Sequence, residues 1–136
     1  MGMFRDAEEL YAVQGGFFDL ITVDSSLGPK FAASDTSFLV KYTDPEAFIL
    51  VDCTGDENRV IYPASPDTDA EITLTMEADA GHRFWLGDLN LTGAIARRKV
   101  TIHGSMKDAL RLLPAMKPAF PKYRTYCIES GHADKT

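Results

Sequence analysis

Two segments in the second half of the chain, in which every other residue is apolar, constrain the fold more than any other feature. Residues 70–76 read AEITLTM, and residues 99–103 read KVTIH. Because successive side chains of a β-strand point to opposite faces, this alternation predicts two strands that each bury one face and expose the other to water. The chain is therefore expected to contain a β-sheet with a covering layer on its apolar side.

A helix is predicted after each of these strands. Glu77 and Asp79 place negative charge at the start of the first helix, where the helix dipole favours it. This short helix is expected to end at Phe-Trp-Leu (residues 84–86), before an apolar loop. Ser105 and Asp108 have the spacing of a capping box, and the apolar residues that follow recur at i, i+3, i+4 and i+7. The second helix is therefore predicted to be amphipathic.

Three prolines follow in the segment LLPAMKPAFPKY, residues 112–123. Proline removes a backbone donor and clashes with the preceding turn, so this segment cannot form one straight helix. A further helix is expected to begin near Pro118 or Pro121 and to end by Gly131, with residues 132–136 frayed. Its apolar residues share one face, which we expect to lie on the sheet.

The first half of the chain is expected to supply a helix and three strands. The N-terminal helix is expected to be broken at Gly15-Gly16, because glycine weakens a helix interior by about 1 kcal/mol relative to alanine. Residues 37–42 and 48–53 contain continuous apolar runs and flank an Asp-Pro turn, which predicts two strands covered on both faces. Residues 59–62 are predicted to form a short third strand.

Taken in order, the motifs of residues 70–123 resemble those of the sterol-carrier-protein type two family, a family of lipid-binding modules. The matching stretches are DAEITLTM, HRFWLGDLNLTGAIA, KVTIHGS and LLPAMKPAFPKYR. Where that family usually has a glycine before the lysine of the last strand and an acidic residue after its final glycine, this chain has Arg98 and Ser105. The resemblance implies an α/β (α+β) fold, in which a five-stranded mixed sheet has helices packed on one side around an apolar tunnel.

The resemblance also implies that the tunnel holds a lipid: a sterol, a fatty acid, an acyl-CoA ester or a phospholipid. No cofactor, metal or catalytic residue is expected. Burial of a long acyl chain yields on the order of 10 kcal/mol gross, at about 0.8 kcal/mol per methylene, and micromolar binding requires about 8 kcal/mol net. The candidate ligand-binding residues are large apolar side chains of the second half: Phe84, Trp85, Leu86, Leu89, Leu91, Ile95, Leu110, Leu113, Met116 and Phe120.

Two other interpretations stay open. In the first, side chains fill the interior of the same fold, so no cavity is left. The protein is then a non-catalytic accessory or dimerisation module, for example a homodimer. In the second, the chain is an enzyme that uses Asp79 with His82, or Cys53. Against the second, no further His or Cys pair lies near His82 to complete a metal site. Cys53 lies in an apolar strand, where a thiol is usually inert. All histidines are expected to be solvated.

Length and charge limit the remaining classes. At 136 residues the chain is expected to be a single domain, 1–136, that needs no disulfide or metal. Its net charge of −6 disfavours nucleic acid and limits any membrane contact to a transient one. Cys53 and Cys127 are expected to be reduced and buried. Because neither a signal peptide nor a membrane-spanning run is visible, a cytoplasmic location is expected.

One basic cluster stands out on this acidic chain. It consists of Arg97-Arg98-Lys99, together with Arg83 and Lys107. Two interpretations fit it: a solvated strand edge, or a docking site for an anionic headgroup or an acidic partner.

Overall fold

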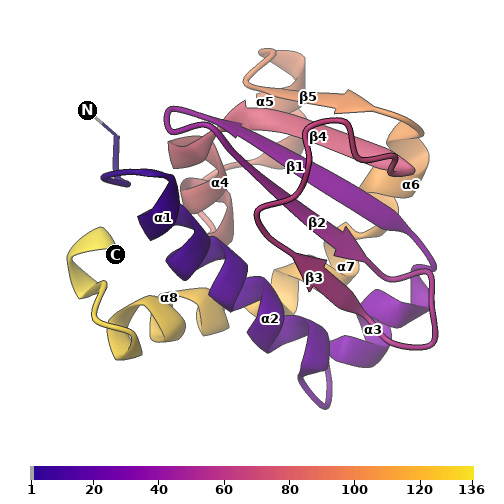
Figure 1. Ribbon diagram of the computed structural model, residues 1–136, viewed down its shortest axis with the longest axis horizontal. Helices are drawn as coiled ribbons and strands as arrows, with labels where there is room; N and C mark the ends of the chain where they lie inside the picture. Colours follow the sequence, from indigo (N-terminus) through magenta and orange to yellow (C-terminus); the bar gives the residue numbers. More distant parts are fainter. Residues whose placement is uncertain (1) are drawn as a thin grey trace.

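A five-stranded mixed sheet forms the centre of the computed structural model, which describes residues 2–136 (Figure 1). The strand order is β3-β2-β1-β4-β5; β1 and β4 run parallel, and the other neighbouring pairs are antiparallel. The strands are β1 (Ser37–Thr43), β2 (Ala47–Asp52), β3 (Arg59–Ile61), β4 (Ile72–Glu77) and β5 (Val100–His103). All five strands lie within one or two residues of the segments predicted from the sequence.

The helices pack against this sheet and make up most of the rest of the chain. They are α1 (Ala7–Leu10), a π-helical turn (Tyr11–Gly15), α2 (Gly16–Val23), α3 (Gly28–Ala33), α4 (Ala78–Trp85), α5 (Leu91–Ala96), α6 (Met106–Arg111), α7 (Leu113–Met116), a 3₁₀ turn (Lys117–Ala119), α8 (Phe120–Glu129) and a second 3₁₀ turn (Ala133–Lys135). Within residues 2–136, no helix is long and apolar enough to cross a membrane.

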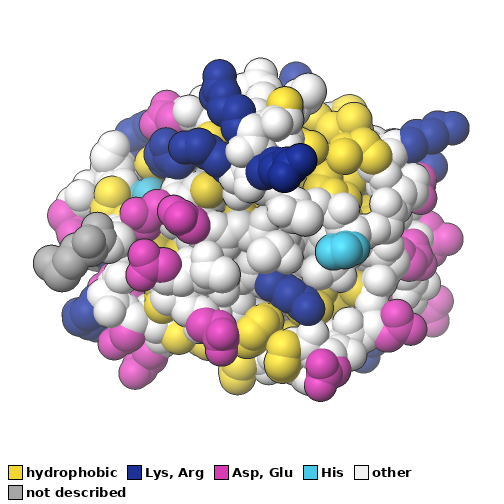
Figure 2. All heavy atoms as spheres, turned by 90° about the horizontal axis from the view of Figure 1, so that it is seen from above, with side chains coloured by type: hydrophobic (Ala, Val, Ile, Leu, Met, Phe, Trp, Pro, Cys, Tyr) yellow, Lys and Arg dark blue, Asp and Glu magenta, His cyan; other side chains and the backbone are white. Residues whose placement is uncertain are grey.

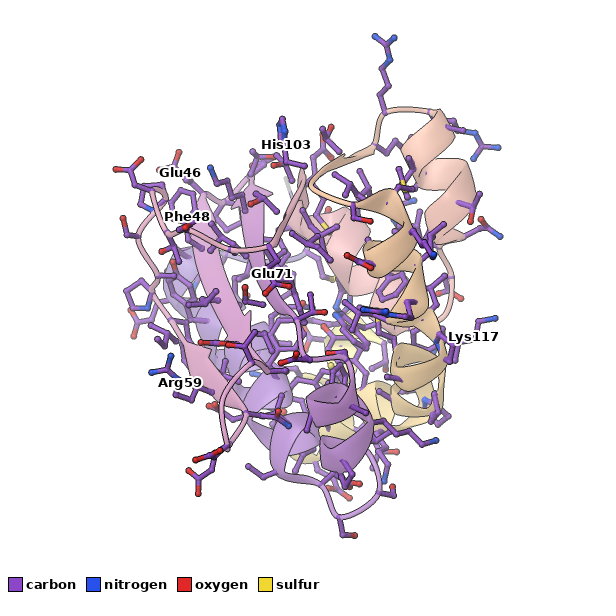
Figure 3. All side chains as sticks on the ribbon, turned by 90° about the vertical axis from the view of Figure 1, so that its right-hand side faces the viewer. Glu46, Phe48, Arg59, Glu71, His103 and Lys117 are labelled. Atoms are coloured by element: carbon purple, nitrogen blue, oxygen red, sulfur yellow. The ribbon has the colours of Figure 1, made fainter. Side chains whose placement is uncertain are left out.

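The sheet and the helices form two layers, as a view along the sheet shows (Figure 3). Glu46, Phe48 and Arg59 lie on the side of the sheet away from the helices, and Lys117 lies at the far edge of the helical layer. Leu39 and Leu50 are buried on the outer side, under Ala64 of the β3–β4 loop. This loop explains why β1 and β2 are apolar on both faces, as predicted.

The N-terminal helix is not broken at Gly15-Gly16. The chain stays helical from α1 to α2 and accommodates a π-helical turn between them. A Cβ on Gly15 would lie 2.9 Å from the ring of Tyr62, and one on Gly16 would clash with the hydroxyl of Tyr126. The two glycines therefore allow these aromatic side chains to approach the helix closely. The prediction that they break the helix was wrong.

Two short helices were not predicted from the sequence. α5 occupies part of the predicted apolar loop, and it begins at Asn90, whose side chain accepts a hydrogen bond from the Gly93 amide at 2.8 Å. α3 carries Pro29 in its first turn, where a missing amide costs nothing. Both helices are too short for a clear apolar periodicity, so Asn90 and Pro29 are the sequence signals of their first turns.

The C-terminal region follows the predicted pattern up to its last residues. Pro114, Pro118 and Pro121 each lie in the first turn of a new helical segment. Residues 132–136, which were expected to fray, are instead tied to the N-terminal region. The Nζ atom of Lys135 is buried, donates to the carbonyl oxygen of Met3 at 3.0 Å and lies 3.1 Å from Oε1 of Glu9.

Candidate functional site

An apolar pocket opens where the end of α4 meets α5 and the C-terminal helices. Its volume is about 480 Å³, which lies within the usual range of small-molecule sites. Its apolar wall consists of Phe84, Leu89, Leu91, Leu113 and Phe120, and Gly87, Asp88, Asn90, Thr92 and Lys117 complete the lining. The pocket therefore combines five apolar side chains with four polar or charged ones.

The helix-facing side of the sheet is covered unevenly. Phe38 and Val40 of β1 are buried there, whereas Leu74 of β4 and Ile102 of β5 remain half-buried. Leu74 is the register partner of both Val40 and Ile102, so these three side chains point to the same side. The helical layer thus covers Leu74 and Ile102 only in part, although Ile72 and Val100 on the same face are buried.

The surface at this end of the molecule includes an exposed apolar area. Seen from the side on which β5 and α5 lie outermost, hydrophobic side chains form an exposed area (Figure 2). The apolar residues of these elements and of α6 that keep partial exposure are Leu91, Ile95, Ile102, Met106 and Leu110. Exposed apolar area of this kind is typical of a binding surface.

The ten residues predicted to bind a ligand fall into three groups. Five of them line the pocket: Phe84, Leu89, Leu91, Leu113 and Phe120. Leu86, Ile95 and Leu110 are half-buried outside its lining, and Trp85 and Met116 are buried in the core. Sequence reasoning missed the polar residues of the lining, because loop and turn residues carry no periodic signal.

Trp85 lies in a packed cluster of aromatic rings. Its ring centroid is 5.2 Å from that of Phe17, 5.6 Å from that of Phe18 and 6.1 Å from that of Phe120, all with edge-on geometry. Such contacts fill space efficiently and stabilise the core. Aromatic rings therefore occupy the space around Trp85 where the tunnel was expected, and the apolar pocket lies to one side of them.

His82 is buried, so the expectation that it is solvated was wrong. Its Nε2 lies 2.7 Å from the carbonyl oxygen of Lys135, and its Nδ1 lies 2.6 Å from the hydroxyl of Tyr123. Because a carbonyl oxygen can only accept, Nε2 carries the proton and Nδ1 accepts from Tyr123. Asp79 does not join this pair, since its Oδ1 accepts from the Met3 amide at 2.8 Å. Both ring nitrogens of His82 are thus occupied.

The hydrogen-bonded chain continues from Tyr123 across the core. Nε2 of Gln14 donates to the Tyr123 hydroxyl at 2.7 Å, and the Tyr42 hydroxyl donates to Oε1 of Gln14 at 2.8 Å. Burial raises the pKa of both tyrosines well above its usual range, so both stay protonated. Burial lowers the pKa of His82, although its bond to the Lys135 carbonyl acts in the opposite direction. This geometry suits a structural network.

The two cysteines are free and buried, as predicted. Burial, together with the negative charge of Asp52, raises the pKa of Cys53 to about 11. A thiol with so high a pKa holds very little of the nucleophilic thiolate at neutral pH. Among residues 2–136, no group of three or more His, Cys, Asp and Glu side chains is placed to hold a metal ion.

The family model described as the SCP-2 sterol transfer family matches residues 18–117 of the chain. No curated protein sequence matches it.

Solved structures with the same fold include three of note. The sterol carrier protein domain 2 of Helicoverpa armigera has a TM-score of 0.63 and 16% identity, over 84% of this chain and 87% of that one. Sterol Carrier Protein-2 from Aedes aegypti, in complex with the C16 fatty acid palmitate, has a TM-score of 0.55 and 19% identity, over 83% and 96%. The sec-alkylsulfatase Pisa1 from Pseudomonas sp. has a TM-score of 0.60 and 18% identity, over 74% of this chain but 16% of the enzyme.

Proposed function

The chain belongs to the SCP-2 sterol transfer family, whose members bind and transfer lipids, and we propose that this chain binds an apolar lipid reversibly in the pocket between α4, α5 and α7. A fatty acid is the ligand class that we favour. The observation that carries the proposal is the convergence of five large apolar side chains, Phe84, Leu89, Leu91, Leu113 and Phe120, on this one pocket.

The pocket offers an acyl chain both apolar contact and a charged end. An acyl chain that covers the half-buried side chains around the pocket would gain about 25 cal/mol for each Å² of apolar surface removed from water. Lys117 lies in the lining and can pair with a carboxylate, whereas Asp88, in the same lining, disfavours one nearby. We therefore expect the carboxylate of a fatty acid to lie toward Lys117.

A flexible chain suits this site better than a rigid ring system. Packed aromatic rings close off the space around Trp85, so the ligand must follow a pocket that opens to one side. A chain with many rotatable bonds can adapt to such a shape, at a cost in conformational entropy. The structure of the mosquito protein, which holds palmitate, supports the same choice.

We further propose that the chain acts by binding alone. His82 is enclosed in a structural network, Cys53 is buried as a protonated thiol, and Asp79 caps the Met3 amide. The likeness to one part of a sulfatase concerns the fold and supplies no catalytic group.

The test is native mass spectrometry of the purified protein, followed by calorimetric titration of the delipidated protein with palmitate. We expect one bound lipid per chain and micromolar affinity or better. A stable dimer that contains no lipid and does not bind palmitate would instead favour the accessory or dimerisation module.

A further inference from the structure

We propose that a second pocket, lined by Arg83, Arg98 and Lys99, binds an oxyanion of the phosphate class. Its volume is about 320 Å³. It lies where β4 passes into α4 and β5 begins, and it shares no lining residue with the apolar pocket. The fold thus gathers three of the five residues of the basic cluster at one hollow, although Arg83 is distant in sequence from the other two.

The three cations have no ion-pair partner within residues 2–136. None of Arg83, Arg98 and Lys99 forms an ion pair with a carboxylate in the part of the chain that the structure describes. Glu77 is the acidic residue of the lining, so three positive charges face one negative charge. On a chain with a net charge of −6, such a local excess of positive charge attracts an anion specifically to this place.

Neutral donors lie beside these cations. Thr43, Thr75 and Thr101 contribute to the same lining, and Thr75 and Thr101 are register partners on β4 and β5. Hydroxyl groups can donate to an oxyanion while the guanidinium groups pair with it in a bidentate manner. A tetrahedral dianion has enough acceptor oxygens for all of these donors. A single carboxylate has fewer acceptor oxygens.

The backbone at Arg98 is an independent observation that points the same way. Its φ angle is +61°, in the left-handed region that disfavours any residue with a Cβ. The amide of Arg98 bonds to the Ile95 carbonyl at 3.0 Å, and that of Lys99 bonds to the Ala94 carbonyl at 2.9 Å. This is the Schellman ending of α5, at a position that glycine usually occupies. Arg98 therefore presents its guanidinium group at this position at a cost in backbone strain, and strain of this kind is often found at binding sites.

The surface view agrees with this placement. Lysine and arginine side chains gather on the face on which α5 and β5 lie outermost, next to the exposed hydrophobic area (Figure 2). The phosphate can belong to a lipid headgroup or to a free phosphate compound, because either would present the same oxygens to the three cations.

The test is a titration followed by NMR of the backbone amides at constant ionic strength, with inorganic phosphate as the probe. We expect saturable shifts at residues 75–77 and 98–101. Arg98→Gly and Arg83→Gln should each weaken binding about 10-fold or more, which is the loss expected for one charge-assisted contact. Arg97→Gln, which removes an equal charge outside the lining, is the matched control. Arg98→Gly also relieves the backbone strain, so this variant should unfold at a higher temperature than the wild type while it binds phosphate less well.

The source of the phosphate is resolved with two single-chain lipids of equal length, a lysophosphatidic acid and a monoacylglycerol. If the pocket takes a headgroup, the phosphate lipid binds more tightly than the neutral one, and Arg98→Gly removes the difference. If it takes a free phosphate compound, inorganic phosphate binds to the pocket but both lipids bind equally. The absence of saturable shifts with any phosphate probe, or an equal loss in Arg97→Gln, overturns the proposal. Binding of the neutral lipid reports separately on the apolar pocket.

Discussion

The hydroxyl of Tyr123 donates its proton to Nδ1 of His82 over 2.6 Å, and neither side chain is more than 1% exposed. The direction of this bond follows from its neighbours, since Nε2 of His82 must donate to the Lys135 carbonyl. Gln14 in turn donates to the oxygen of Tyr123. The network therefore joins the N-terminal helix, α4, α8 and the last residues of the chain through groups that have no water to replace a lost partner.

Tyr123→Phe is expected to destabilise the fold more than the loss of one hydrogen bond would suggest. The variant leaves both Nδ1 of His82 and Nε2 of Gln14 buried without a partner, at a cost of about 2–3 kcal/mol in the free energy of unfolding. Urea denaturation measures this change. The control is Tyr126→Phe, which removes a more exposed bond to the Ala12 carbonyl and should cost less than about 1 kcal/mol. Equal losses in the two variants would contradict the network.

Stability should depend on pH through His82. Burial lowers its pKa in the folded state below the value of about 6.5 that it has in the unfolded state. The unfolded chain therefore binds more protons as the pH decreases below about 6.5, and the free energy of unfolding must fall there. Above that pH, His82 contributes no slope. The measurement is urea unfolding between about pH 5 and pH 8 for the wild type and His82→Gln. Parallel curves would rule out this role.

Polar substitution in the apolar pocket should weaken lipid binding while the fold persists. Leu91 and Leu113 are half-buried and line the pocket from two helices. Leu91→Gln or Leu113→Gln replaces apolar contact by an amide of similar size, so we expect the dissociation constant for palmitate to rise about 10-fold, or about 1.4 kcal/mol. Ile128→Gln is the matched control, because Ile128 is 51% exposed and lies outside this lining. An equal effect of all three variants would disprove this placement.

Both cysteines should be unreactive in the folded protein. Burial raises the pKa of Cys127 as well as that of Cys53, so both remain protonated and shielded from reagents. A chromogenic disulfide reagent at about pH 8 should detect no thiol before denaturation and two thiols after it. Rapid reaction of Cys53 in the native state would instead support the interpretation that the chain is an enzyme that uses Cys53.

The sheet was largely predictable, because its strands carry a local signal. Alternation in β4 and β5 and the continuous apolar runs of β1 and β2 place these strands within a residue or two. In α4, Ala78, His82 and Trp85 recur at helical spacing, so the burial of His82 could have been inferred from its apolar face. The burial of Lys135 could not have been inferred from the sequence, because it depends on contacts with residues at the opposite end of the chain.

The candidate site was predictable only in part, for a physical reason. A pattern of apolar residues shows which side chains leave water, but not whether they meet one another or enclose a space. Leu91 and Trp85 are both large apolar residues of the predicted lining. Leu91 lines the pocket, whereas Trp85 is surrounded by aromatic rings. The arrangement of the helices around the pocket decides between these outcomes.

Release of the lipid is expected to require movement of the proline-rich C-terminal helices. Leu20 of α2 and Thr125 of α8 line a common groove and are exposed, so cysteines at these positions can be joined by a short bifunctional reagent, while Cys53 and Cys127 stay buried. The crosslink would hold α8, whose first residue Phe120 forms one wall of the apolar pocket. We therefore expect the rate of palmitate transfer between protein and vesicles to fall several-fold, with the uncrosslinked double variant as the control. An unchanged rate would mean that lipid leaves without movement of α8.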